Sequence, residues 1–158
     1  MTRRAVFVGG LLATLLGCTS IDPGSNLVVP PTSFDPDYFY CHVEPQFIFG
    51  AAYKCGPGDP SKGDSGNCHF SSAVPGMELQ DHPPINCGGG DHPVDLSALG
   101  TGSMAVSNYT AVSLEMNADY TSAPVYVRPL GNTHPRSIFT SQDSFVAQIL
   151  ATWAAKSQ

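Results

Sequence analysis

The sequence predicts a small, mainly α domain that is rich in loops. Sixteen Gly and fourteen Pro are spread through 158 residues, which indicates short elements joined by irregular segments. Apolar residues recur at helical spacing in three stretches, 38–52, 104–116 and 141–156. Four of the five cysteines lie between residues 41 and 87, and an even number favours covalent cross-links in an oxidising compartment.

The N-terminus has the pattern of a secretory signal. Met1–Arg4 is positively charged, and Ala5–Leu16 is apolar or small with one exception. The run is too short to span a bilayer, which takes about 20 apolar residues. It ends in Leu15-Leu16-Gly17-Cys18, which resembles the bacterial lipobox. This resemblance implies that residues 1–17 are a signal peptide, removed in the mature protein, and that the sulfur of Cys18 carries diacylglycerol.

The rest of the chain divides into a tether and a domain. Residues 18–33 are rich in Pro, Gly and Ser and predict a tether, and residues 34–158 are long enough for one domain with its own core. We therefore expect a protein of the cell envelope whose contact with the membrane is the N-terminal lipid. Thr19 stands where Asp would indicate retention in the inner membrane, which favours the outer membrane.

The mature chain is expected to be acidic. Without Arg3 and Arg4 it has five Lys and Arg against thirteen Asp and Glu, a net charge of −8 with His neutral. Such a charge repels phosphate backbones, so we expect no nucleic-acid partner. It also repels anionic lipid, so the lipid on Cys18 must supply the attachment to the membrane.

The first predicted helix begins at Pro36. Asp35 suits the N-cap and Pro36 the first helical position. Pro45 is expected to interrupt or restart this helix, whose apolar face would continue to Cys55. The next twelve residues, 56–67, contain no apolar residue except Pro and predict a loop.

The second half of the domain contains two predicted helices. Met104–Met116 has an apolar stripe. The short β-branched segment Val125–Val127 is expected to be extended before Pro129. Ser141–Lys156 has the clearest helical pattern, with Ser141 as cap and Asp143 in the first turn. Its expected buried side chains are Phe145, Ile149, Leu150 and Trp153.

Cys68 and His69 are adjacent, which is the arrangement that covalent haem attachment requires. Two thiols form thioethers with the vinyl groups, and a His after the second thiol reaches the iron. The usual spacing is C-x-x-C-H, whereas the preceding cysteine here is Cys55, which gives C-x12-C-H. The longer spacing still allows attachment if the intervening loop bulges away and returns both sulfurs to one edge of the macrocycle.

Two stretches resemble small bacterial envelope cytochrome c domains. The first runs over residues 37–70, with aromatic residues, a Val43-Glu44-Pro45 step and the Cys68-His69 pair. The second runs over residues 107–155, with a Ser-Ala-Pro step at 122–124, His134-Pro135 and a final helix containing Trp153. The resemblance implies a cytochrome c-like helical domain that binds haem c and passes electrons to a redox protein partner.

The resemblance also implies roles for single residues. Cys55 and Cys68 would attach the haem, and His69 would be the proximal ligand. His134 would be the distal ligand, with Met116 or Met104 as the alternative. Met ligation raises the reduction potential relative to His. The remaining cysteines, Cys41 and Cys87, would form a disulfide.

Other functions remain open from the sequence. The main alternative is a cofactor-free, disulfide-stabilised lipoprotein with a structural or binding role, for which Cys41–Cys55 and Cys68–Cys87 is the simplest pairing. The repeated Asp-His-Pro at 81–83 and 91–93 could supply His82 and His92 to a zinc hydrolase site, although no HExxH spacing supports it. No G-x-S-x-G motif and no paired carboxylates occur, so we do not expect an enzyme.

Overall fold

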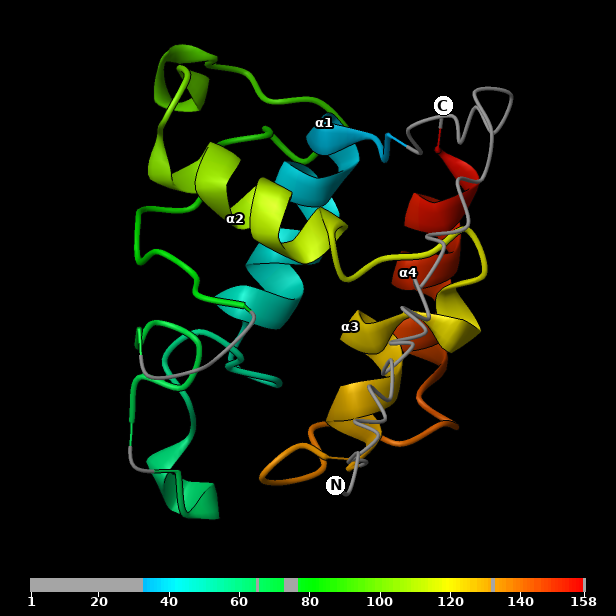
Figure 1. Cartoon of the computed structure of the whole chain (residues 1–158). Helices are drawn as coiled ribbons and strands as arrows, with labels where there is room; N and C mark the ends of the chain where they lie inside the picture. Colours follow the sequence, from blue (N-terminus) through cyan, green and yellow to red (C-terminus); the bar gives the residue numbers. More distant parts are fainter. Residues whose placement is uncertain (1–32, 65, 73–76, 132, 158) are drawn as a thin grey trace, which may run out of the picture. The chain divides into compact units, whose positions relative to one another are not determined.

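A computed structural model describes residues 33–64, 66–72, 77–131 and 133–157. The chain divides into the units Met1–Pro30 and Pro31–Gln158, and every described residue belongs to the second. The expected signal peptide 1–17, Cys18 and nearly all of the tether lie outside the described residues. In the described part all regular secondary structure is helical, which confirms a small, mainly α, loop-rich fold (Figure 1). None of its helices has the length and apolarity needed to cross a bilayer.

The helical elements are short, and long irregular segments separate η1 from α2. The longer ones are α1 (Pro36–Tyr38), which continues directly into the π-helix η1 (Phe39–Ile48), then α2 (Met104–Ser113), α3 (Pro124–Val127) and α4 (Ser144–Ala155). Single turns of 3₁₀-helix are η2 (Pro60–Lys62), η3 (Ser97–Leu99), η4 (Tyr120–Ser122) and η5 (Arg128–Leu130).

The N-terminal helix starts where the sequence predicted, passes Pro45 without a break, and ends at Ile48, seven residues before the expected limit at Cys55. The Asp35 carboxylate accepts from the backbone N–H groups of Asp37 and Tyr38, with Pro36 at the first position. Interruption at Pro45 was wrong, because the chain passes through it in π-helical form. In an α-helix a proline ring strikes the carbonyl four residues earlier, and the wider π turn pairs residues five apart, as Phe49 N–H does with the Glu44 carbonyl.

The core lies between this N-terminal helix and α4. Trp153 is fully buried, and its indole Nε1–H donates to the Asp35 carbonyl at 2.9 Å. Its ring lies 5.4 Å from the ring of Phe34 and 5.5 Å from that of Phe39. α4 begins after Asp143, which caps it in place of the expected Ser141. Phe145, expected in the buried stripe, is 46% exposed; the buried residues are Val146, Ile149, Leu150, Trp153 and Ala154.

The remaining helices confirm one prediction and correct another. α2 is helical as expected, is capped by Ser103, and packs against η1 (Figure 1). Val125–Val127 was expected to be extended and is instead part of α3. Pro124 at the first helical position starts a helical turn there, and this local signal outweighs the weak strand preference of two valines and a tyrosine.

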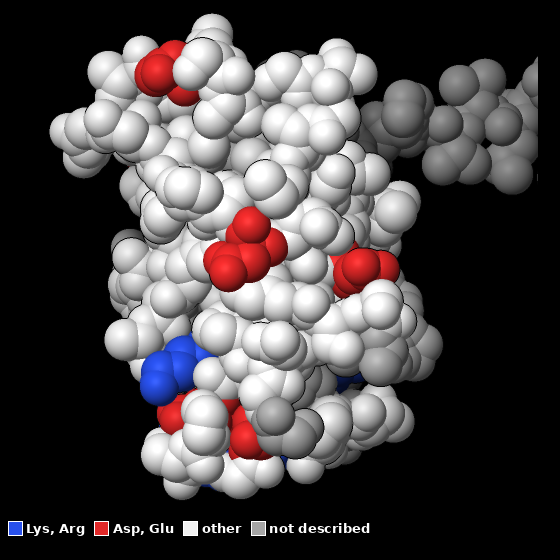
Figure 2. Space-filling view, turned by 90° about the vertical axis from the view of Figure 1, so that its left-hand side faces the viewer, with Lys and Arg blue, Asp and Glu red and all other residues white. Residues whose placement is uncertain are grey.

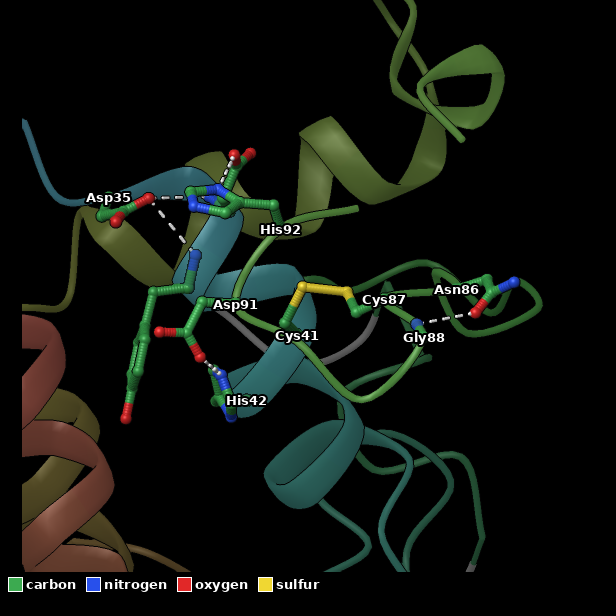
Figure 3. The surroundings of a disulfide bond; sticks show 10 residues. Asp35, Cys41, His42, Asn86, Cys87, Gly88, Asp91 and His92 are labelled. Carbon is green, nitrogen blue, oxygen red and sulfur yellow. Dashed lines mark hydrogen bonds and ion pairs between the residues drawn. A yellow bond between two sulfur atoms is a disulfide. The ribbon is translucent and has the colours of Figure 1, made fainter. Parts of the chain in front are cut away.

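A disulfide fastens the loop before α2 to η1. Cys41 in η1 is bonded to Cys87, 46 residues later (Figure 3). Two hydrogen bonds lie beside it, between His42 Nε2 and Asp91 at 2.8 Å and between His92 Nδ1 and Asp37 at 2.8 Å. Cys55 and Cys68 are free thiols, so the pairing favoured for a cofactor-free protein, Cys41–Cys55 with Cys68–Cys87, is wrong. The observed disulfide is compatible with either function.

Candidate functional site

A pocket of about 950 Å³ has Cys55, Cys68, His69 and His134 on its wall. Its volume is near the upper end of the range for small-molecule and cofactor sites, about 300–1,000 Å³. Every major helix from η1 to α4 contributes to its lining. The apolar part of the wall consists of Val43, Phe47, Ile48, Met77, Leu79, Val112, Val125, Ile138, Phe139 and Leu150.

The two ends of the loop between the thiols are hydrogen-bonded to each other. Asn67 N–H donates to the Pro57 carbonyl at 2.7 Å, and His69 N–H donates to the Cys55 carbonyl at 3.1 Å. These bonds hold the chain at Cys55 beside the chain at Cys68, and both thiols lie on the wall of the same pocket. The two chain segments pack closely at Gly56, where an added Cβ would lie 2.3 Å from the Phe70 ring.

Both imidazoles of the pocket are held in the same way. The Nδ1 of His69 lies 2.8 Å from the Met77 carbonyl, and the Nδ1 of His134 lies 2.7 Å from the Arg136 carbonyl. A carbonyl only accepts, so Nδ1 carries the proton in each ring, and in the neutral form Nε2 keeps its lone pair. The ring centroids are 6.1 Å apart with an interplanar angle of 29°. A backbone carbonyl on Nδ1 is the usual support of a metal-binding His.

Burial favours the neutral imidazole of His69. It lowers the pKa of that side chain, the neighbouring His134 lowers it further, and the hydrogen bond to the Met77 carbonyl opposes both. A neutral imidazole is the form that binds a metal. His69 is therefore prepared for ligation at neutral pH without first losing a proton.

Burial keeps the two thiols protonated. It raises the pKa of Cys55 to about 12, against the opposing effect of the Arg136 guanidinium. The pKa of Cys68 is raised by burial and by the nearby carboxylate of Asp64. Asp64 is itself ionised, since the Arg136 guanidinium, 2.8–2.9 Å from its oxygens, lowers its pKa to about 2. Neither thiol is a thiolate nucleophile near neutral pH.

The methionines considered as ligands lie elsewhere. Met116 is buried in the core and does not line the pocket with His69. Met104 is 49% exposed and lines a separate pocket of about 500 Å³. Met77 does line the larger pocket, and no pattern in the sequence singles it out. It lies in a loop eight residues after His69 and has no helical pattern around it.

The two Asp-His-Pro segments do not converge. His82 is buried and its Nε2 lies 3.0 Å from Glu44, whereas His92 is exposed beside Asp37. Among the described residues no group of three or more His, Cys, Asp and Glu side chains is arranged to hold a metal ion. A zinc site takes three or four protein ligands, so this arrangement gives no support to the zinc hydrolase.

Comparison with protein-family models, with curated proteins and with solved structures finds no match to this chain. The chemistry of the site is therefore inferred from its residues. Two imidazoles are too few for a protein-only metal site, but a porphyrin supplies four nitrogens and leaves two axial positions. The pocket also contains two thiols, and one of them directly precedes His69. This set of donors fits a covalently attached haem.

Proposed function

We propose that this chain is a lipid-anchored protein of the cell envelope whose domain binds haem c and transfers electrons. The observation that carries the proposal is the pocket shared by Cys55, Cys68, His69 and His134, with both imidazoles held through Nδ1. Electron transfer to a redox protein partner is the expected role, without chemistry on a substrate. The lipid on Cys18 would hold the domain at a membrane, with the outer membrane favoured.

Each residue of the pocket has a role in this proposal. Cys55 and Cys68 would hold the haem covalently through thioethers. His69 and His134 would hold its iron through their Nε2 atoms. The bound group supplies one-electron Fe(III)/Fe(II) chemistry. Ligation by two His, without Met, favours the lower part of the potential range.

The deciding experiment is an absorption spectrum of full-length protein made alongside a cytochrome c maturation system. We expect a Soret band and reduced-minus-oxidised bands that persist after acid–acetone extraction, because thioethers hold the group covalently. His69→Ala should abolish the native bands while leaving the helical circular dichroism. His92→Ala is the matched control, because that imidazole is 79% exposed and lies outside the pocket.

The alternative function predicts a different result. A cofactor-free lipoprotein with a structural or binding role would give no Soret band under the same conditions. His69→Ala would then cost about 1 kcal/mol or less of stability, as is usual for a polar substitution outside the core. A colourless wild-type protein from a host that matures a control cytochrome c would contradict the electron-transfer proposal.

A further inference from the structure

Glu44 lies at the centre of a buried polar cluster beside the pocket. Its side chain is 1% exposed, and Oε1 accepts from Asn108 Nδ2 at 3.0 Å and lies 3.0 Å from His82 Nε2. His82 Nδ1 lies 2.8 Å from the Pro83 carbonyl. Both nitrogens of the His82 imidazole therefore face oxygen atoms, and a proton must lie between Nε2 and Glu44 Oε1 if both contacts are hydrogen bonds.

Retaining a carboxyl group here is costly. Burial raises the pKa of Glu44, against the opposing hydrogen bond from Asn108. Its Oε2 is enclosed and has no hydrogen-bond partner in the described part of the chain. Replacing a buried ion pair with packed apolar side chains is often neutral or stabilising. Core packing alone therefore does not account for Glu44.

The cluster is connected to His69 through hydrogen bonds to Gln80 and then along the backbone from Gln80 to Met77. Asn108 is fully buried, and it clamps Gln80 by accepting from the Gln80 N–H at 2.7 Å and donating to the Gln80 carbonyl at 3.0 Å. One residue earlier, Leu79 N–H donates to the His69 carbonyl at 2.7 Å. The same segment carries the Met77 carbonyl that accepts from His69 Nδ1.

We propose that Glu44 is a positioning residue for the pocket: through Asn108 and His82 it fixes the segment Met77–His82, which holds His69 with Nε2 facing the pocket. The segment has no helical or strand structure of its own, so its place depends on these side-chain bonds together with the buried Leu79 and its backbone bond to His69. The inference relies on the proposed function only for the identity of what His69 binds.

The test measures the tautomer of His69 in protein without haem, by long-range ¹H–¹⁵N NMR of the histidine rings. Wild-type protein should show His69 protonated at Nδ1 alone. Glu44→Ala should produce a mixture of Nδ1–H and Nε2–H forms, whereas Glu44→Gln should retain the wild-type form because its amide oxygen still accepts from Asn108. Glu78→Gln is the control, since it removes an exposed carboxylate from the same segment.

Asn108→Ala provides a second test in case Glu44→Ala does not fold. It leaves Glu44 and His82 in contact but releases Gln80, and it should also mix the tautomers. A folded Glu44→Ala or Asn108→Ala protein in which His69 stays entirely Nδ1–H would overturn the proposal. The NMR readout requires no haem, so a missing Soret band together with the expected tautomer change would contradict the proposed function and support the positioning role.

Discussion

His69 gives the domain a pH dependence at the scale of a single residue. Its folded pKa is lowered from the ordinary 6.5, chiefly by burial. The unfolded chain therefore binds a proton that the folded domain disfavours. Its contribution to stability is complete above pH 6.5 and is lost as the pH falls through the folded value.

We therefore expect the urea midpoint of wild-type protein to fall between about pH 8 and about pH 5.5 by more than that of His69→Gln. Glutamine has no titratable group but keeps a polar side chain at the position. His92→Gln, at an exposed position, should keep the wild-type difference. Equal pH dependence in wild-type and His69→Gln protein would exclude His69 as its source.

The pocket thiols should be unreactive in the folded protein. With the pKa of Cys55 at about 12, its thiolate fraction at about pH 8 is about 10⁻⁴, against roughly one quarter for a free thiol. Alkylation of Cys55 by iodoacetamide in haem-free protein should therefore be about a thousandfold slower than after unfolding in urea, as followed by mass spectrometry of the Cys55 peptide. Rapid modification of Cys55 in the folded protein would contradict its burial.

Residues of the site differ in how far the sequence reveals them. The adjacency of Cys68 and His69 marks them as candidates in the sequence, and both line the same pocket in the structure. Glu44 could not be selected, because a glutamate in a helix is ordinarily solvated and its partners Asn108 and His82 are 64 and 38 residues away. Met77 could not be selected either, because it contacts His69 through its backbone carbonyl, which every residue type has.

At the scale of elements, Trp153 is the largest of the side chains that α4 buries. Trp153 is fully buried against two aromatic rings and donates to Asp35. Trp153→Ala should lower the free energy of unfolding by about 3–5 kcal/mol. Phe145→Ala, in the same helix but 46% exposed, should change it by about 0.5 kcal/mol or less. Similar losses from both substitutions, measured by urea unfolding, would show that the buried face of α4 has been misplaced.

Helix starts were predictable where the signal is local. The cap at Asp35 and the proline after it are neighbours, and the helix begins there. The π-helical passage through Pro45 was not predictable, because it depends on packing of η1 against α2 and α4. The helical state of Val125–Val127 shows the same limit, since a short segment adopts the conformation that its flanking turn and its packing dictate.

At the scale of the whole molecule, the Cys41–Cys87 disulfide closes a loop of 46 residues. In the chain-entropy model a loop of this length contributes about 4 kcal/mol to stability. The double substitution Cys41→Ser with Cys87→Ser should lose that amount in denaturant unfolding. Dithiothreitol should lower wild-type stability to the same value and leave the double variant unchanged, and any effect on the variant would point to another disulfide.

Attachment of the whole molecule to a membrane depends on its surface charge and on its expected lipid anchor. The face drawn in Figure 2 carries few charged side chains, in keeping with the 13% charged residues of the chain. Attachment to a membrane is therefore expected to depend on Cys18, which lies outside the described residues. Cys18→Ala should leave the precursor unprocessed or release the protein from membranes, as followed by fractionation and lipid labelling. Unchanged fractionation with no loss of label would contradict the lipobox prediction.

Between the two thiols, the ends of the loop are joined by hydrogen bonds, so the number of residues in the loop and the distance between its ends are independent quantities. The number of residues between Cys55 and Cys68 measures the length of chain, whereas attachment chemistry depends only on where the sulfurs lie in space. Asn67 and His69 bond back to Pro57 and Cys55, so the two ends are held together by bonds that involve no residue between them. Under the proposed function, a motif of fixed spacing would miss such a site, whereas one defined by paired loop ends would include it.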